Sequence, residues 1–135
     1  MQIRSFHSLL LSLALCAAAC GLSPVPLVAS PRVPAAEGIV HIKIDDNGNT
    51  KLKVNVNHLA PPAKVSPGAT VYVAWVSKDD SAPQNVGSFG LDSDLMGELE
   101  TMTPLHGFLL TITAEAEPGV VAPQGVQVFS ARIPD

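Results

Sequence analysis

The sequence predicts an all-β fold, an antiparallel immunoglobulin-like β-sandwich of about seven or eight short strands over residues 38–135. Three observations predict it. The 135 residues include 12 prolines, and each proline inside a helix costs about 3 kcal/mol. Apolar and polar residues alternate with a period of two in several segments, which is typical of strands with one buried face. Turn-forming residues separate these segments throughout the chain.

The N-terminal segment predicts export. Its first twenty residues read MQIRSFHSLLLSLALCAAAC, with Arg4 before an apolar stretch at residues 9–15 and small residues before Cys20. That stretch is too short to span about 30 Å of hydrocarbon, so we expect residues 1–19 to be a signal peptide. The residues around Cys20 resemble a bacterial lipoprotein signal, in which a dedicated peptidase cuts before the cysteine and the cysteine is then acylated.

The resemblance implies that Cys20 is lipidated and anchors the protein to a membrane of the cell envelope. Cleavage there removes Cys16 and leaves a single cysteine, whose free thiol would be a liability in an oxidising compartment. Gly21 follows in place of the aspartate that would suggest inner-membrane retention, which favours the outer membrane. Residues 17–19 also satisfy the A-x-A rule, so cleavage by the ordinary signal peptidase stays open.

Residues 20–37 form the predicted lipidated cysteine and proline-rich tether. Alternating prolines favour polyproline II, in which sixteen residues reach roughly 50 Å. We expect a semi-rigid stalk between the membrane and the sandwich, with a disordered leader as the alternative.

The sandwich begins with a predicted hairpin. Val40, Ile42 and Ile44 share one face of a strand, and a second alternating segment covers residues 51–57. Asn47-Gly48 lies between them, and this pair favours a tight turn because both residues tolerate positive φ. The same loop begins like a calcium-binding loop, with oxygen-bearing side chains at the first ligand positions. Thr50 and Val56 occupy the later positions at which a calcium-binding loop needs glycine and glutamate, so we predict a turn.

Residues 70–76 are apolar on both faces, which predicts a central strand buried from two sides. Trp75 is expected to anchor the core between the sheets, and its indole N–H then needs a partner. In the segment 108–116 the apolar residues face one way, and Thr111, Thr113 and Glu115 are expected on the opposite face. The other predicted strands cover residues 84–89, 97–102 and 126–133.

The order of these motifs resembles the extracytoplasmic C-terminal domain of the anti-sigma-K factor family. The matching residues are Pro67, Gly68, Tyr72, Trp75, Gly87, Phe89, Gly97, Thr113, Glu117, Pro118, Gly119, Pro123 and Gly125. The resemblance implies a β-sandwich that senses, docks or spaces outside the cytoplasm, and it supplies no catalytic residues. The sigma-binding helical domain and the membrane helix of that family have no counterpart in this sequence, so we do not expect sigma-factor sequestration.

Composition and motifs favour a non-enzymatic role. The net charge is −4, which leaves no basic surface for nucleic acid. No nucleophile elbow, phosphate loop or Ser/His/Asp arrangement is evident. We therefore predict no cofactor and no enzyme activity, with a membrane and an envelope protein as the partners.

Two alternatives remain. Met96, Met102 and His106 carry ligand types that suit Cu(I), with His41 and His58 as possible additions, although their spacing has no defined metal geometry. A small hydrolase would need carboxylates that converge only in three dimensions. Six acidic residues could converge in this way, or could instead form a solvated acidic rim. They are Asp79, Asp80, Asp92, Asp94, Glu98 and Glu100.

Overall fold

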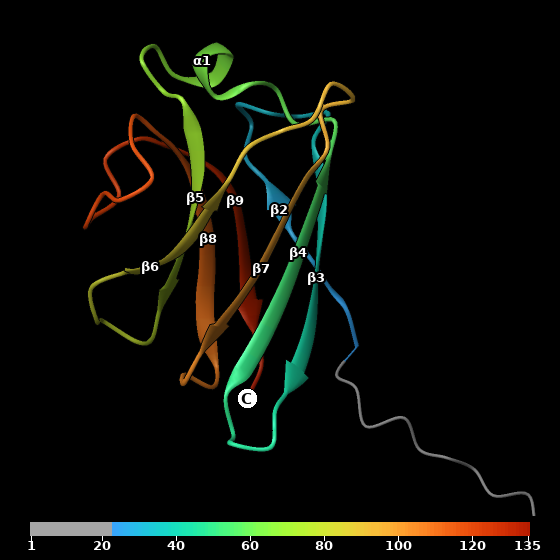
Figure 1. The fold of residues 1–135 in the computed structure, drawn as a ribbon, viewed down its shortest axis with the longest axis vertical. Coiled ribbons are helices and arrows are strands. Elements are labelled where there is room, and N and C mark those ends of the chain that lie inside the picture. The colour runs from blue at the N-terminus through green and yellow to red at the C-terminus, as the bar shows by residue number, and fades with distance from the viewer. Residues whose placement is uncertain (1–22) are drawn as a thin grey trace, which may run out of the picture.

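The computed structural model describes residues 23–135 and confirms the all-β sandwich. Two antiparallel sheets pack face to face (Figure 1). The four-stranded sheet has the order β1-β3-β4-β7, with bounds Val25–Pro26, Glu37–Ile44, Thr50–Asn57 and Gly97–Thr103. The five-stranded sheet has the order β2-β9-β8-β5-β6, with bounds Val28–Ala29, Val126–Ile133, Phe108–Glu115, Val71–Ser77 and Gln84–Phe89.

The predicted β3–β4 hairpin is confirmed. The strands pair in register from Glu37 opposite Asn57 to Ile44 opposite Thr50. In the turn, Asp45 Oδ1 accepts hydrogen bonds from the backbone N–H groups of Asn47 and Asn49, each at 2.9 Å. These bonds, chiefly the one from Asn49, lower the pKa of the Asp45 carboxyl. The carboxylate is therefore committed to the turn.

The proline-rich tether is where the sequence prediction is wrong. Residues from Val25 onward belong to the sandwich, because β1 pairs with β3 and β2 pairs with β9. Between them, Leu27 donates its backbone N–H to the Gly38 carbonyl at 2.9 Å, and its side chain is only 7% exposed. Val33 and Ala36 are buried too. The prolines are tolerated because they lie at sheet edges and in turns, where a missing N–H breaks no central ladder.

The strand β5 is buried on both faces, as predicted, but its two faces meet different neighbours. Tyr72, Ala74 and Val76 belong to the apolar core between the sheets. Alternate residues of a strand point to opposite sides, so Val73 and Trp75 lie on the outer face of the five-stranded sheet. Trp75 is fully buried there, which corrects the expectation that it fills the space between the sheets.

One short helix, α1 (Pro62–Val65), forms between β4 and β5. It makes a single turn at the end of the sandwich where β4 ends and β5 begins (Figure 1). Its last residue, Val65, is buried, and the Arg32 guanidinium donates to the Val65 carbonyl at 3.3 Å. Within residues 23–135 no helix is long and apolar enough to cross a membrane.

Candidate functional site

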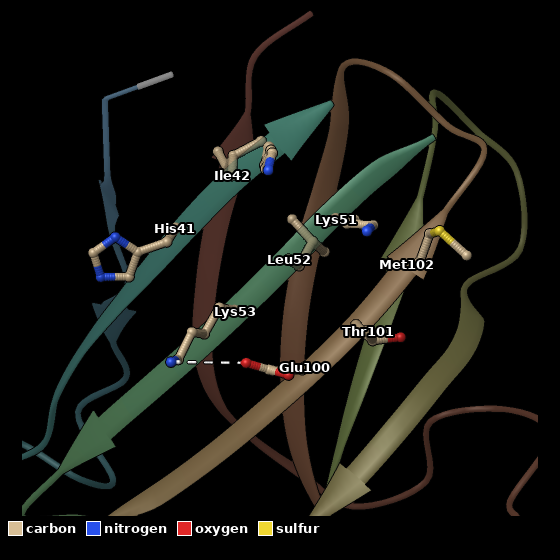
Figure 2. A pocket seen from close by; sticks show the side chains of 9 residues that line it. His41, Ile42, Lys51, Leu52, Lys53, Glu100, Thr101 and Met102 are labelled. Carbon is tan, nitrogen blue, oxygen red and sulfur yellow. Dashed lines mark ion pairs between the residues drawn. The ribbon is translucent and has the colours of Figure 1, made fainter. Parts of the chain in front are cut away.

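The outer face of the four-stranded sheet is open to solvent, and we call it the open face. It consists of the side chains on β3, β4 and β7 that point away from the core. They are Ile39, His41, Lys43, Lys51, Lys53, Asn55, Glu98, Glu100 and Met102. A groove of about 470 Å³ runs across it between β3 and β7. Figure 2 shows its side chains standing on three neighbouring strands.

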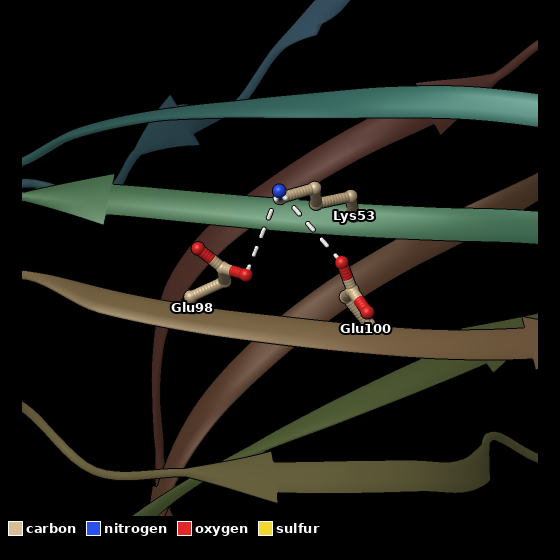
Figure 3. Close-up of polar contacts among 3 residues, drawn as sticks. All are labelled: Lys53, Glu98 and Glu100. Atoms are coloured by element: carbon tan, nitrogen blue, oxygen red, sulfur yellow. Dashed lines mark ion pairs between the residues drawn. The ribbon is translucent and has the colours of Figure 1, made fainter.

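The strand register sets the charge pattern of the open face. Lys53 on β4 lies between His41 on β3 and Glu100 on β7. Its ammonium group lies 3.7 Å from a carboxylate oxygen of Glu98 and 3.7 Å from one of Glu100 (Figure 3). All three side chains are about half exposed or more, so each pair contributes at most about 1 kcal/mol to stability. The pairs order the charges and leave them accessible.

The other end of the groove is basic. Lys43 and Lys51 face each other directly across β3 and β4, an arrangement that costs free energy because like charges repel. Within residues 23–135 neither ammonium group forms an ion pair with a carboxylate. Met102 lies next to Lys51 on β7 and is 51% exposed. The groove therefore combines a basic end, an acidic strand and exposed apolar surface.

Two of the candidate copper ligands, Met96 and Met102, lie far apart. Met96 immediately precedes β7 and Met102 is near its far end, and six residues of extended strand span roughly 20 Å. His106 lies in the turn after β7, and Figure 2 shows His41 and Met102 on opposite sides of the groove. Met96 therefore cannot bind the same ion as Met102. In the described part of the chain, no three His, Cys, Asp or Glu side chains are arranged to hold a metal ion.

The acidic loop residues also divide between the two ends of the sandwich. Asp79 and Asp80 follow β5, whereas Asp92 and Asp94 follow β6 at the opposite end. Asp92 accepts hydrogen bonds at 2.9 Å from the backbone N–H groups of Asp94 and Met96, so it stabilises its own turn. These four carboxylates do not converge.

Residues 116–125, the loop between β8 and β9, lie over part of the outer face of the five-stranded sheet, near the end where β8 ends (Figure 1). Beneath it, the Trp75 indole N–H donates to the Thr113 hydroxyl at 2.8 Å, and that hydroxyl donates to Glu115 Oε1 at 2.8 Å. The same oxygen accepts from the backbone N–H groups of Gln124 and Gly125, at 2.9 and 3.0 Å. A continuous polar chain thus connects the buried tryptophan to the covering loop.

The alternation of apolar and polar residues correctly predicted that Thr113 and Glu115 lie on the face away from the core. It did not predict that both are buried, each with only 3% of its surface exposed. The loop is also fixed at its other side, where the Asn85 side-chain amide on β6 donates to the Pro118 and Val120 carbonyls at 2.9 Å. The only signal available in the sequence was the turn-rich Glu-Pro-Gly segment that follows β8.

Comparisons of the sequence with models of known protein families and with curated proteins find no match. Fold and surface together define the class: an antiparallel β-sandwich with one open outer face and one that a loop covers in part. The lipidation candidate Cys20 and the predicted signal peptide lie outside the described residues.

Proposed function

We propose that this chain is a non-enzymatic, lipid-anchored protein of the bacterial cell envelope, and that its β-sandwich binds a protein partner through the open face. The contrast between the two outer faces carries the proposal. On one face a loop covers Trp75, while the other has a groove lined in part by Met102, which is 51% exposed. Exposed apolar surface within a charged surround is typical of interaction surfaces.

Export and anchoring rest on the sequence of residues 1–20. Since the sandwich begins at Val25, only residues 21–24 separate it from an acylated Cys20. Four extended residues span at most about 14 Å, so the anchored domain would stand close to the membrane instead of 50 Å away. The resemblance to the anti-sigma-K extracytoplasmic domain supports a sensing or docking role in the same compartment.

The charges of the open face suggest the chemistry of the partner. Lys43 and Lys51 offer a positive end that forms no ion pair within residues 23–135, while Glu98 and Glu100 are already neutralised in part by Lys53. A partner with carboxylates opposite the lysine pair and an apolar side chain over Met102 would complement the groove.

Site-specific photocrosslinking in cells tests the open face. A photoreactive residue replaces Met102 in one strain and Val121, which is 89% exposed on the covering loop, in the control strain. We expect one defined adduct from position 102, lost when Lys43 and Lys51 are both changed to Glu, and no such adduct from position 121. Equal adducts from both positions would contradict the proposal.

The anchor has a separate test. Mass spectrometry of the membrane fraction should find the N-terminal peptide acylated at Cys20, and Cys20→Ala should release the protein into the soluble fraction. Unmodified Cys20 would contradict lipidation without bearing on the open face.

A further inference from the structure

A second recess lies away from the open face, at the end of the sandwich where β8 ends. It has a volume of about 210 Å³ and is bounded by the turn before β5 and by the loop before β9. Ser66 and Gly68 contribute from the turn, and Gln124 and Gly125 from the loop.

Glu115 lies in the wall of this recess and has an unusual environment. It is 3% exposed, and its Oε1 atom accepts all three of its hydrogen bonds. Its Oε2 atom accepts none from residues 23–135. Because no side-chain oxygen or nitrogen of those residues is both buried and unpaired, Oε2 keeps a small opening to solvent. Glu115 and Gly125 both line the recess, and a Cβ built on Gly125 would lie 3.3 Å from Oε2, so we infer that the opening leads into the recess.

No cation of the described chain neutralises this carboxylate. The only ion pairs there involve Lys53, and the Arg32 guanidinium, near the recess, is bonded to the Val65 carbonyl. Burying a carboxylate without an opposite charge costs free energy, which the three hydrogen bonds offset at one oxygen only. The second oxygen therefore attracts a cationic donor more strongly than an exposed carboxylate does.

Gly125 keeps the recess in this form. A Cβ at that position would come within 1.6 Å of the Ala114 carbonyl oxygen and 3.3 Å of Glu115 Oε2. The absence of a side chain lets the loop lie against β8 and leaves the free side of the carboxylate open.

We propose that this recess binds one organic cation, an ammonium or guanidinium group, through Glu115 Oε2. The source that fits best is a lysine or arginine side chain of a partner protein, because a single charged group on a narrow stem fills the recess without disturbing the loop. This site is independent of the open face and of the lipid anchor.

Amide chemical shifts measured by NMR on the purified protein test the proposal. Titration with n-butylammonium chloride should give saturable shifts at the Gln124 and Gly125 amides, while n-butanol and sodium chloride at equal concentration should give none. Equal shifts with butanol, or none with butylammonium, would overturn the site. Both comparisons use the unaltered protein.

The variant Glu115→Gln separates binding from folding. It keeps one carbonyl oxygen for the Thr113, Gln124 and Gly125 donors and replaces the other oxygen with an amide NH₂, which repels a cation. We expect butylammonium to bind about tenfold more weakly, with Trp75 emission unchanged. Undiminished binding would overturn the role of Glu115. A Gly-Lys-Gly peptide that binds more tightly than butylammonium identifies a partner side chain as the source, and equal affinity identifies a free amine.

Discussion

Replacing Thr113 with valine removes one hydroxyl and nearly preserves the shape of the side chain. The hydroxyl serves two neighbours at once, since it accepts from the Trp75 indole and donates to Glu115, each at 2.8 Å. Both neighbours are buried. In Thr113→Val the indole N–H keeps its burial and loses its acceptor, and the carboxylate loses one of three donors.

The magnitude follows from these two losses. A buried donor without a partner costs about 1–3 kcal/mol, and a hydrogen bond to a charged group contributes about 1.5–3 kcal/mol. The additional valine methyl returns up to about 0.8 kcal/mol by apolar burial. We therefore expect the free energy of unfolding to fall by about 3 kcal/mol, a large share of the roughly 5–15 kcal/mol of a typical domain.

Urea unfolding followed by fluorescence measures this loss directly. The chain has a single tryptophan, so the emission reports on Trp75 alone. Thr111→Val is the matched control, because Thr111 lies on the same face of β8, opposite Trp75, and its hydroxyl forms no hydrogen bond within residues 23–135. The control should change stability by less than about 0.5 kcal/mol. Equal losses in the two variants, or no loss in Thr113→Val, would refute the reasoning.

Three further predictions concern other parts of the sandwich. Leu27→Ala should destabilise the domain by about 2–5 kcal/mol and Val28→Ala, at a 66% exposed position, by much less; equal urea midpoints would mean that the N-terminal segment does not pack as described. Gly125→Ala should cost several kcal/mol because of the clash with a backbone carbonyl, whereas Gly119→Ala, which meets nothing within 4 Å, should leave the melting temperature almost unchanged. Burial raises the pKa of Tyr72 to about 12, so the stability that this phenol contributes is complete below pH 10 and is lost as the pH rises from 10 to 12. Absorbance titration of this single tyrosine should give a midpoint near 12 in buffer and near 10 in urea, and a midpoint near 10 in both would contradict its burial.

Strands with a clear period of two could be predicted from the sequence, and their side-chain directions with them. In β3 and β4 alternation gives the side chains that point outward, and the turn between the two strands brings these side chains to one face. The strand β5 gives no such information, because residues on both of its faces are apolar. Nothing in its pattern says that Tyr72 meets the other sheet while Trp75 meets a loop.

The errors arise where long-range contacts decide the structure. Two-residue strands such as β1 and β2 are too short to show a period of two. The four prolines in sixteen residues therefore predicted a tether where the structure has strands. The burial of Glu115 depends on a loop that folds back over β8, which alternation does not report. Met96 and Met102 are close in sequence, but an extended strand separates its ends by more than any ligand set can bridge.

Because the sandwich begins at Val25, the orientation of the anchored domain relative to the membrane can be inferred. The chain enters the sandwich along β1, antiparallel to β3, so β1 begins on the side nearer the end where β3 turns into β4 (Figure 1). With Cys20 acylated as proposed, that end faces the membrane. Glu115 is the last residue of β8, which ends at the opposite end of the sandwich, roughly 25 Å away over eight strand residues. A partner presenting a cation thus reaches the recess without approaching the bilayer, whereas a partner on the open face must lie alongside the domain, next to the lipid headgroups. With both sites occupied as proposed, they would therefore take different partners, or separate parts of one large partner, because a small partner cannot span both.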